Sequence, residues 1–398
     1  MLGSLLGLKL AQLGNSSTSA ALIMTGYYFG LIIGFRLSLR IIKRVGHIRA
    51  FAAFCGVNIS ATLLLSSTNL VGVWVALRLL MGLSMMGSYM VIESWINERA
   101  SAEIRGKIFA IYLIISYAAL GGGQLLLDFA DQGIDLLILC AGLFSLCLIP
   151  VALTRSISPE PLQATKLNVK QLIKVAPHAI FGCLLAGLAT GSFYALGPAF
   201  AFSQGNDSHF VGLFMAATIF GGLLLQWPLG MLSDRYKRRT ILQVLGGCLT
   251  LSSLLVIVLQ THWYFVFIAA ALWGGIAFTI YPVAVAYAND RIDPQERVAA
   301  SGVLLMSYSL GAATGPLFAS ALMHLSGASG LYIFSAIVGL LLALLEAKRR
   351  GAIKVSVDEQ GSYIPVPRTS AVIHELNPRI EEALEEIEEN QSTAEKTT

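Results

Sequence analysis

Eleven stretches of mainly apolar residues run through the chain, and each is about as long as a bilayer-spanning helix, which needs roughly 20 residues. Inside lipid a backbone must satisfy its own hydrogen bonds, so such stretches fold as α-helices. Charged residues make up only 13% of the chain, too few to cover a water-facing surface. The sequence therefore predicts an all-α, polytopic membrane protein whose main partner is the lipid bilayer. The predicted spans are 18–42, 48–67, 69–95, 106–128, 134–154, 176–202, 208–232, 240–260, 262–287, 298–323 and 328–347.

An internal repeat divides the chain into two related halves. The sequence Asn-Glu-Arg at 97–99, with an arginine six residues beyond its last residue, recurs as Asn-Asp-Arg at 289–291 with an arginine at the same spacing. The offset is 192 residues (97 to 289), close to half of the 398-residue chain. Duplicated halves in so apolar a chain are typical of secondary transporters.

The repeat and the spans together predict two pseudo-symmetric six-helix bundles, twelve spans in all. The apolar segment 1–13 must then supply the first span, although it is too short to cross a bilayer at about 1.5 Å per residue. We therefore expect a truncated first helix, or a sequence that begins inside it. The predicted organisation is an N-terminal bundle at 1–154, a cytoplasmic linker at 155–175, a C-terminal bundle at 176–350 and an acidic cytoplasmic tail at 351–398.

Basic residues mark one side of the membrane. They gather in every second connection between spans, whereas the alternate connections carry Asp128, Asp131, Asp135 and Asp207. By the positive-inside rule, both termini are expected in the cytoplasm. Membrane topology thus accounts for the basic excess before residue 351, and we expect no nucleic-acid partner. The tail, with ten acidic and four basic residues, is expected to be solvated and partly ordered.

A charged motif follows the span at 208–232. Its glycine would allow two helices to touch closely, and Asp234 is expected at the positive N-terminus of a neighbouring helix, the span 106–128. Its arginines are expected to meet helix C-termini or acidic groups across the halves. The motif would then act as a latch on the cytoplasmic side, whereas the alternative is simple topological anchoring. The motif residues that we assign to the latch are Gly230, Asp234, Arg235, Arg238 and Arg239.

The repeated turns fall on the same side of the membrane, where two bundles can meet. We interpret them as further parts of a cytoplasmic gate, and helix-end capping with topological charge is the alternative. The matching region of the first half has Lys43 in place of the latch aspartate, so a second, symmetric latch is not expected. The gate residues contributed by the turns are Asn97, Glu98, Arg99, Arg105, Asn289, Asp290, Arg291 and Arg297.

Ionisable residues inside spans are costly unless they face protein or water. Arg78 is therefore a candidate for proton coupling or for binding an anionic substrate, and a buried structural hub is the alternative. Glu93 could meet Arg36 or Arg40, and burial would make it a candidate proton carrier. Side chains that could line a cavity, with packing as the alternative, are Tyr89, Tyr194, Gln226, Trp273, Tyr281 and Tyr308.

Several segments resemble one protein family. The sequence Gly-Met-Leu-Ser-Asp-Arg-Tyr-Lys-Arg-Arg at 230–239 is similar to the cytoplasmic motif of the major facilitator superfamily, except that Lys237 replaces its second glycine. Segments 44–51, 93–107 and 363–368 resemble the YcaD-like bacterial branch of that superfamily. The resemblance implies a multi-pass inner-membrane transporter of a small molecule, working by alternating access between two bundles. We expect proton coupling and a monomer.

Motifs of enzymes are not found in the sequence, which has no nucleophile elbow, no P-loop and no zinc-protease signature. We therefore expect no enzymatic activity, no cofactor and no metal site. The alternative function is that of a non-transporting membrane sensor or scaffold that acts through its cytoplasmic tail.

Overall fold

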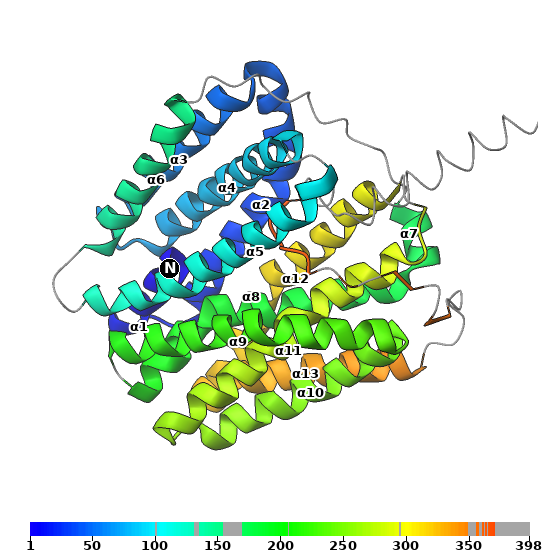
Figure 1. Ribbon diagram of the computed structural model, residues 1–398. Helices are drawn as coiled ribbons and strands as arrows, with labels where there is room; N and C mark the ends of the chain where they lie inside the picture. Colours follow the sequence, from blue (N-terminus) through cyan, green and yellow to red (C-terminus); the bar gives the residue numbers. More distant parts are fainter. Residues whose placement is uncertain are drawn as a thin grey trace, which may run out of the picture.

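The computed structural model describes residues 1–99, 102–130, 135–153, 169–205, 207–293, 296–348, 356–357, 360–361, 363 and 365–370. Its regular structure is helical throughout these ranges, as Figure 1 shows. The helices of the first half are α1 (Leu2–Gln12), α2 (Ser17–Val45), α3 (His47–Ser66), α4 (Val71–Arg99), α5 (Ala102–Leu125), the 3-10 turn η1 (Leu126–Ala130) and α6 (Leu136–Leu153). After α7 (Val169–Val175) come α8 (Pro177–Gly205), α9 (Ser208–Arg235), α10 (Arg238–Leu259), α11 (Trp263–Asn289), α12 (Arg297–Ser326), η3 (Gly327–Ser329) and α13 (Gly330–Lys348).

The predicted spans are confirmed as helices. Ten segments of the described chain are long and apolar enough to cross a membrane, and the last of them, Ala299–Ala347, takes in both α12 and α13. The short α1 completes the first bundle, and its leucines are buried against α8 of the second bundle. The expected two six-helix bundles, with a short first helix, are therefore confirmed.

The two bundles are built alike, as the sequence repeat predicts. In the first, α2 crosses α4 so closely that a Cβ at Gly82 would collide with the carbonyl oxygen of Tyr27. In the second, α9 crosses α11 just as closely, and a Cβ at Gly274 would collide with the carbonyl oxygen of Thr218. The two glycines are 192 residues apart (82 to 274), the same offset as the repeated charged turns. The internal repeat is thus a repeat of helix packing.

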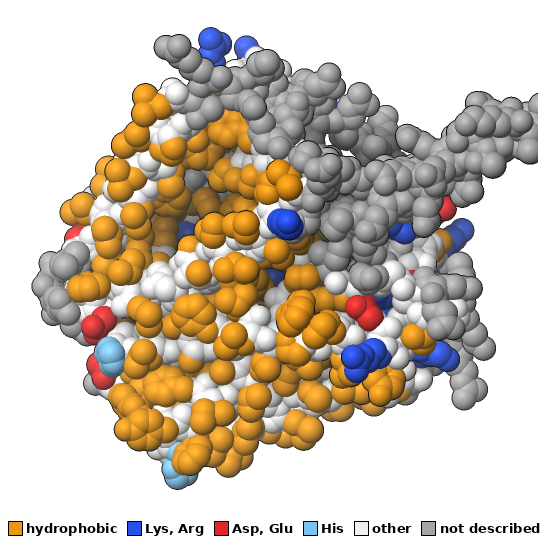
Figure 2. Space-filling model, in the orientation of Figure 1, with side chains coloured by type: hydrophobic (Ala, Val, Ile, Leu, Met, Phe, Trp, Pro, Cys, Tyr) orange, Lys and Arg blue, Asp and Glu red, His pale blue; other side chains and the backbone are white. Residues whose placement is uncertain are grey.

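Apolar side chains cover the outside of both bundles. Leu224, Val258 and Tyr264 are each at least 70% exposed, which suits contact with lipid chains. Figure 2 shows hydrophobic side chains spread over both bundles, with Lys and Arg gathered toward the right and the top of the view. We call the end of the molecule with the basic turns (45–47, 235–238 and 289–293) the basic end, and the other the opposite end.

The bundles touch each other at the opposite end. There the Thr18 hydroxyl of α2 lies 2.9 Å from Nε2 of His324 in α12. Nδ1 of His209 in α9 lies 3.2 Å from the Asp128 carboxylate, just after α5. Deeper in the molecule the Thr25 hydroxyl donates to the Ala313 carbonyl at 2.7 Å. Contacts between the halves therefore close the molecule at this end.

Candidate functional site

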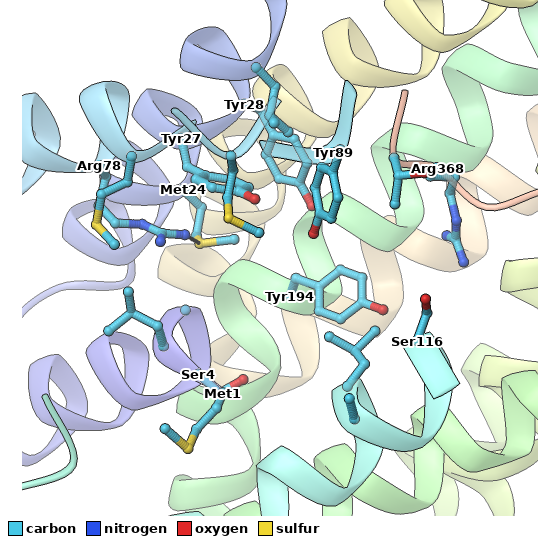
Figure 3. A pocket seen from close by; sticks show the side chains of 18 of the residues that line it. Met1, Ser4, Met24, Tyr27, Tyr28, Arg78, Tyr89, Ser116, Tyr194 and Arg368 are labelled. Carbon is cyan, nitrogen blue, oxygen red and sulfur yellow. Dashed lines mark hydrogen bonds between the residues drawn. The ribbon is translucent and has the colours of Figure 1, made fainter. Parts of the chain in front are cut away.

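A cavity of about 620 Å³ lies between the two bundles. Its walls come from α1, α2, α4 and α5 of the first half, from α8 and α12 of the second half, and from the C-terminal segment 367–369. Figure 3 shows Arg78 at one side of this space, Arg368 at the other and the ring of Tyr194 between them. A space of this size, lined by tyrosines and a few charged groups, suits a small-molecule ligand.

The guanidinium of Arg78 faces the cavity without an acidic partner. It lies 4.2 Å from the centre of the Tyr27 ring, and Nη2 is 3.3 Å from the sulfur of Met24. No salt bridge among the described residues includes Arg78, although the side chain is only 4% exposed. A buried cation held mainly by a ring and a thioether can accept an anionic group or a water molecule from the cavity.

The segment 363–370 of the tail enters the molecule between the bundles. In Figure 1 the last described residues, in red, pass between α2, α5 and α12. Tyr363, Val366 and Ser370 are all buried, with Ser370 only 1% exposed. The expectation of a solvated tail is therefore wrong for this segment, because its apolar and hydroxyl side chains pack into the space that the bundles leave open.

Arg368 of the tail places a positive charge at the cavity. Its Nη1 donates to the Tyr308 hydroxyl at 3.3 Å, and its Nη2 donates to the Tyr117 hydroxyl at 3.2 Å. The guanidinium carbon lies 4.6 Å from the centre of the Phe278 ring. Aromatic groups from α5, α11 and α12 thus surround this cation.

Glu93 lies at the end of the tail segment and is fully buried in α4. Its carboxylate accepts hydrogen bonds from the Tyr112 hydroxyl, at 2.9 Å, and from the hydroxyls of Thr369 and Ser370. The expected pairing with Arg36 or Arg40 is not formed, since both arginines are exposed and no salt bridge among the described residues includes either. Instead, two residues of the tail are the partners of this carboxylate.

Arg238 is the centre of the charged network at the basic end. Its Nε donates to Asp290 at 2.6 Å, its Nη2 to Asp234 at 3.3 Å and its Nη1 to the Ser233 hydroxyl at 3.0 Å. It also donates to the carbonyl of Gly361 in the tail. The network therefore joins α9, α10, the end of α11 and the tail.

Asp234 does not cap α5 as expected. Its other carboxylate oxygen accepts the backbone N–H of Tyr363 at 2.9 Å. The ring of Tyr363 lies on Gly230, where a Cβ would collide with it. The glycine and aspartate of the latch motif therefore hold the tail, a contact that the sequence pattern does not predict.

The other predicted gate residues are placed as follows. Arg235 is exposed, whereas Arg239 donates to the Glu346 carbonyl oxygen at 2.9 Å. Asn289 is buried, and Arg291 lies 3.6 Å from the centre of the Tyr287 ring. Asn97 is partly buried in the last turn of α4, and Arg297 begins α12. The side chains of Glu98, Arg99 and Arg105 lie outside the described part of the chain.

The predicted cavity residues are only partly brought together. Tyr89, Tyr194 and Tyr308 line the cavity. Gln226 accepts a hydrogen bond from Tyr117 at 2.7 Å, which links α9 to α5 across the halves. Tyr281 packs behind Tyr308, with the ring centres 5.1 Å apart, and Trp273 is bonded to Ser253 and Ser335 within the second bundle.

Sequence reasoning missed three residues of this site, namely Tyr117, Phe278 and Arg368. The one signal available was an arginine after a Pro-x-Pro sequence in an otherwise acidic tail. Metal chemistry has no support in the described ranges, where no group of three or more His, Cys, Asp and Glu side chains could hold an ion.

Comparisons with known proteins agree with this architecture. Residues 179–362 match the family model described as Major Facilitator Superfamily. The chain is 27% identical over 356 residues to an uncharacterized MFS-type transporter YcaD of Salmonella typhimurium, covering 88% of this chain and 92% of the relative. It is 28% identical over 361 residues to the YcaD protein of Escherichia coli O6:K15:H31, with the same coverage.

Two solved structures share the fold. The nucleoside transporter NupG superposes with a TM-score of 0.72 at 13% identity, over 88% of this chain and 95% of that protein. A bacterial homolog of the human lysosomal transporter Spinster was solved in an inward-facing and unoccupied conformation. It superposes with a TM-score of 0.59 at 13% identity, over 86% of this chain and 95% of that protein.

Proposed function

Because the chain belongs to the major facilitator superfamily, we propose that it is a secondary active transporter that moves a small molecule by alternating access. The observation that carries this proposal is the cavity, whose walls come from both bundles. Rocking one bundle against the other would open such a cavity first to one side of the membrane and then to the other.

The closed opposite end indicates which stage of that cycle the structure represents. The contacts Thr18–His324 and Asp128–His209 hold the bundles together there. Toward the basic end, residues of the tail lie between the bundles and bond to Asp234 and Tyr117. With the basic end assigned to the cytoplasm by the positive-inside rule, we infer an inward-facing arrangement of an inner-membrane protein.

Glu93 is the residue that we assign to proton coupling. It is a fully buried carboxyl group near the cavity, and its hydroxyl partners can donate to a charged carboxylate or accept from a neutral one. Protonation would remove a buried negative charge from Glu93. Proton binding could therefore favour one conformation over the other.

The network of Arg238 is the gate element that we propose for the basic end. Arg238 connects Asp234 and Asp290 within the second bundle and reaches the tail through Gly361. Full closure of the basic end would bring the turn at 97–99 toward this network. The turns at 97–99 and 289–291 would then form opposite faces of one gate.

Uptake into proteoliposomes tests the function. A thermal-shift screen of the purified protein against small metabolites and drugs selects candidate solutes, and uptake is then measured under an imposed pH gradient. We expect saturable uptake of at least one hit that collapses with the gradient. If no hit crosses the membrane faster than in protein-free vesicles, the transporter proposal fails, and a non-transporting sensor becomes the better account.

A further inference from the structure

The side chains around Arg368 form a compact receptor for a positive charge. We define the aromatic cage as Tyr117, Tyr194, Phe278 and Tyr308, which come from α5, α8, α11 and α12. Tyr194 stacks on Phe278 with ring centres 5.9 Å apart. We propose that the aromatic cage is the binding site for an organic cation with a guanidinium or ammonium group, and that Arg368 occupies it as an internal competitor.

The cage holds its cation without an ion pair. Among the described residues no salt bridge includes Arg368. Its guanidinium group donates to two phenol oxygens and lies near the rings of Phe278 and Tyr308, with its carbon 5.5 Å from the centre of the Tyr308 ring. Electron-rich ring faces attract cations, more strongly where water is excluded. The same arrangement would hold the charged group of a free molecule of matching size.

A buried carboxylate lies next to the cage. Thr369 and Ser370, which follow Arg368 directly, both donate to Glu93. When the tail leaves, Glu93 loses these two donors, and a bound cation would supply a charge to compensate it. The tail therefore covers both the cage and the carboxylate that favours a cation there.

The tail is bonded to the gate through Gly361 and Tyr363, and its residue Arg368 reaches the cage. Gly361 and Tyr363 are bonded to Arg238 and Asp234, and Pro365 and Pro367 limit the backbone freedom of the segment that follows. A tethered group acts at an effective concentration on the order of millimolar, so it competes well with free solutes. Such an occupant lowers the apparent affinity for a solute in proportion to the fraction of time it is bound.

This inference names the substrate class of the transporter proposed above, and its test is a binding measurement on the full-length protein in detergent. The probes are butylguanidinium and its neutral counterpart, butylurea, titrated by calorimetry. We expect Arg368→Gln to bind butylguanidinium at least about tenfold more tightly than the unaltered protein does. This gain is expected if Arg368 occupies the cage about 90% of the time, because the site is then free for only about a tenth of the time. Arg368→Lys, which keeps the charge, and Lys43→Ala, an exposed basic control, should leave the affinity unchanged.

The position of the new binding is tested by a second change in the Arg368→Gln background. Tyr117→Phe and Phe278→Leu should each remove most of the gain for butylguanidinium, and thermal melts show whether each variant is folded. The inference is overturned if Arg368→Gln gains nothing, if butylurea gains equally, or if neither cage change reduces the gain in a folded protein. If Arg368→Gln gains affinity but no solute is taken up, only the transporter proposal is contradicted. If a solute is taken up but Arg368→Gln gains no affinity for butylguanidinium, only the proposed role of the aromatic cage is contradicted.

Discussion

The Nε of Arg238 lies 2.6 Å from Oδ2 of Asp290, and both side chains are buried. This contact joins the motif at the end of α9 to the second copy of the repeated turn. The two strongest charged signals in the sequence therefore belong to one network, and the same arginine also reaches the tail. A change at Arg238 should disturb the gate and the tail together.

Replacing Arg238 with Ala should destabilise the protein strongly. The change leaves the Asp290 carboxylate buried without its arginine, and loss of one partner of a buried pair costs about 3–5 kcal/mol in free energy of unfolding. Denaturation in detergent, followed by helical circular dichroism, measures the effect. The control is Arg235→Ala at the exposed neighbouring arginine, expected within about 0.5 kcal/mol of the parent. Equal losses in the two variants would contradict the role of the network.

Arg78→Met should leave the protein as stable as before or more so, while abolishing or altering transport. An arginine in a span without an acidic partner costs about 2.5–3.5 kcal/mol, and methionine suits the neighbouring Met24. Thermal melts and uptake assays measure the two effects, with lipid-facing Leu80→Met as the control. A large loss of stability in Arg78→Met, with transport retained, would show that Arg78 is a structural hub instead.

Glu93→Gln should uncouple transport from protons. The amide cannot gain or lose a proton in the physiological range, so uptake should no longer respond to an imposed pH gradient. Proteoliposome uptake at several external pH values measures this, with Asp293→Asn on the exposed side of the basic end as the control. Unaltered proton dependence in Glu93→Gln would remove Glu93 from the coupling mechanism.

Gly82→Ala should weaken the crossing of α2 and α4. The added Cβ would collide with the Tyr27 carbonyl oxygen, so the helices must separate, at a cost of about 1–3 kcal/mol. Gly56→Ala is the matched control, because a Cβ there meets open space and alanine favours helix by up to about 1 kcal/mol. Melting temperatures that fall equally in both variants would argue against a close crossing.

Two truncations separate the parts of the tail. Removal of 351–398 should expose a cysteine placed at Ser116 in the cavity to a water-soluble thiol reagent, because the tail segment that forms part of the cavity wall is gone. Removal of 371–398 alone keeps residues 363–370 and should leave Ser116→Cys protected. Labelling rates, measured in a background without the native cysteines, compare the two. Equal protection in both truncated proteins would mean that the tail does not occupy the cavity.

The sequence predicted the fold well because lipid imposes a simple rule. A long apolar stretch must be a helix, and the offset of 192 residues that relates the charged turns also relates Gly82 to Gly274. Arg78, Tyr89 and Tyr194 were likewise identified as cavity candidates, since polar groups in spans tend to face protein interiors.

The position of the tail could not be predicted in this way. A segment with two prolines has no helical periodicity, so nothing in its pattern shows which surface it contacts. Arg368 meets Tyr117 and Phe278 only because α5 and α11 of different halves converge. The partners of Glu93 were misjudged for the same reason, as two of them come from residues 276 and 277 positions away.

Distances between spin labels at the two ends of the molecule test alternating access most directly. One pair is placed at exposed Leu70 and Tyr264 on the opposite end, and another at exposed Lys43 and Tyr236 on the basic end, in a background without the native cysteines. Pulsed electron paramagnetic resonance is recorded across pH and with the best hit of the binding screen. We predict two populations that change together, so that the first distance lengthens as the second shortens. Distances that stay fixed under all conditions, or that lengthen at both ends at once, would contradict alternating access.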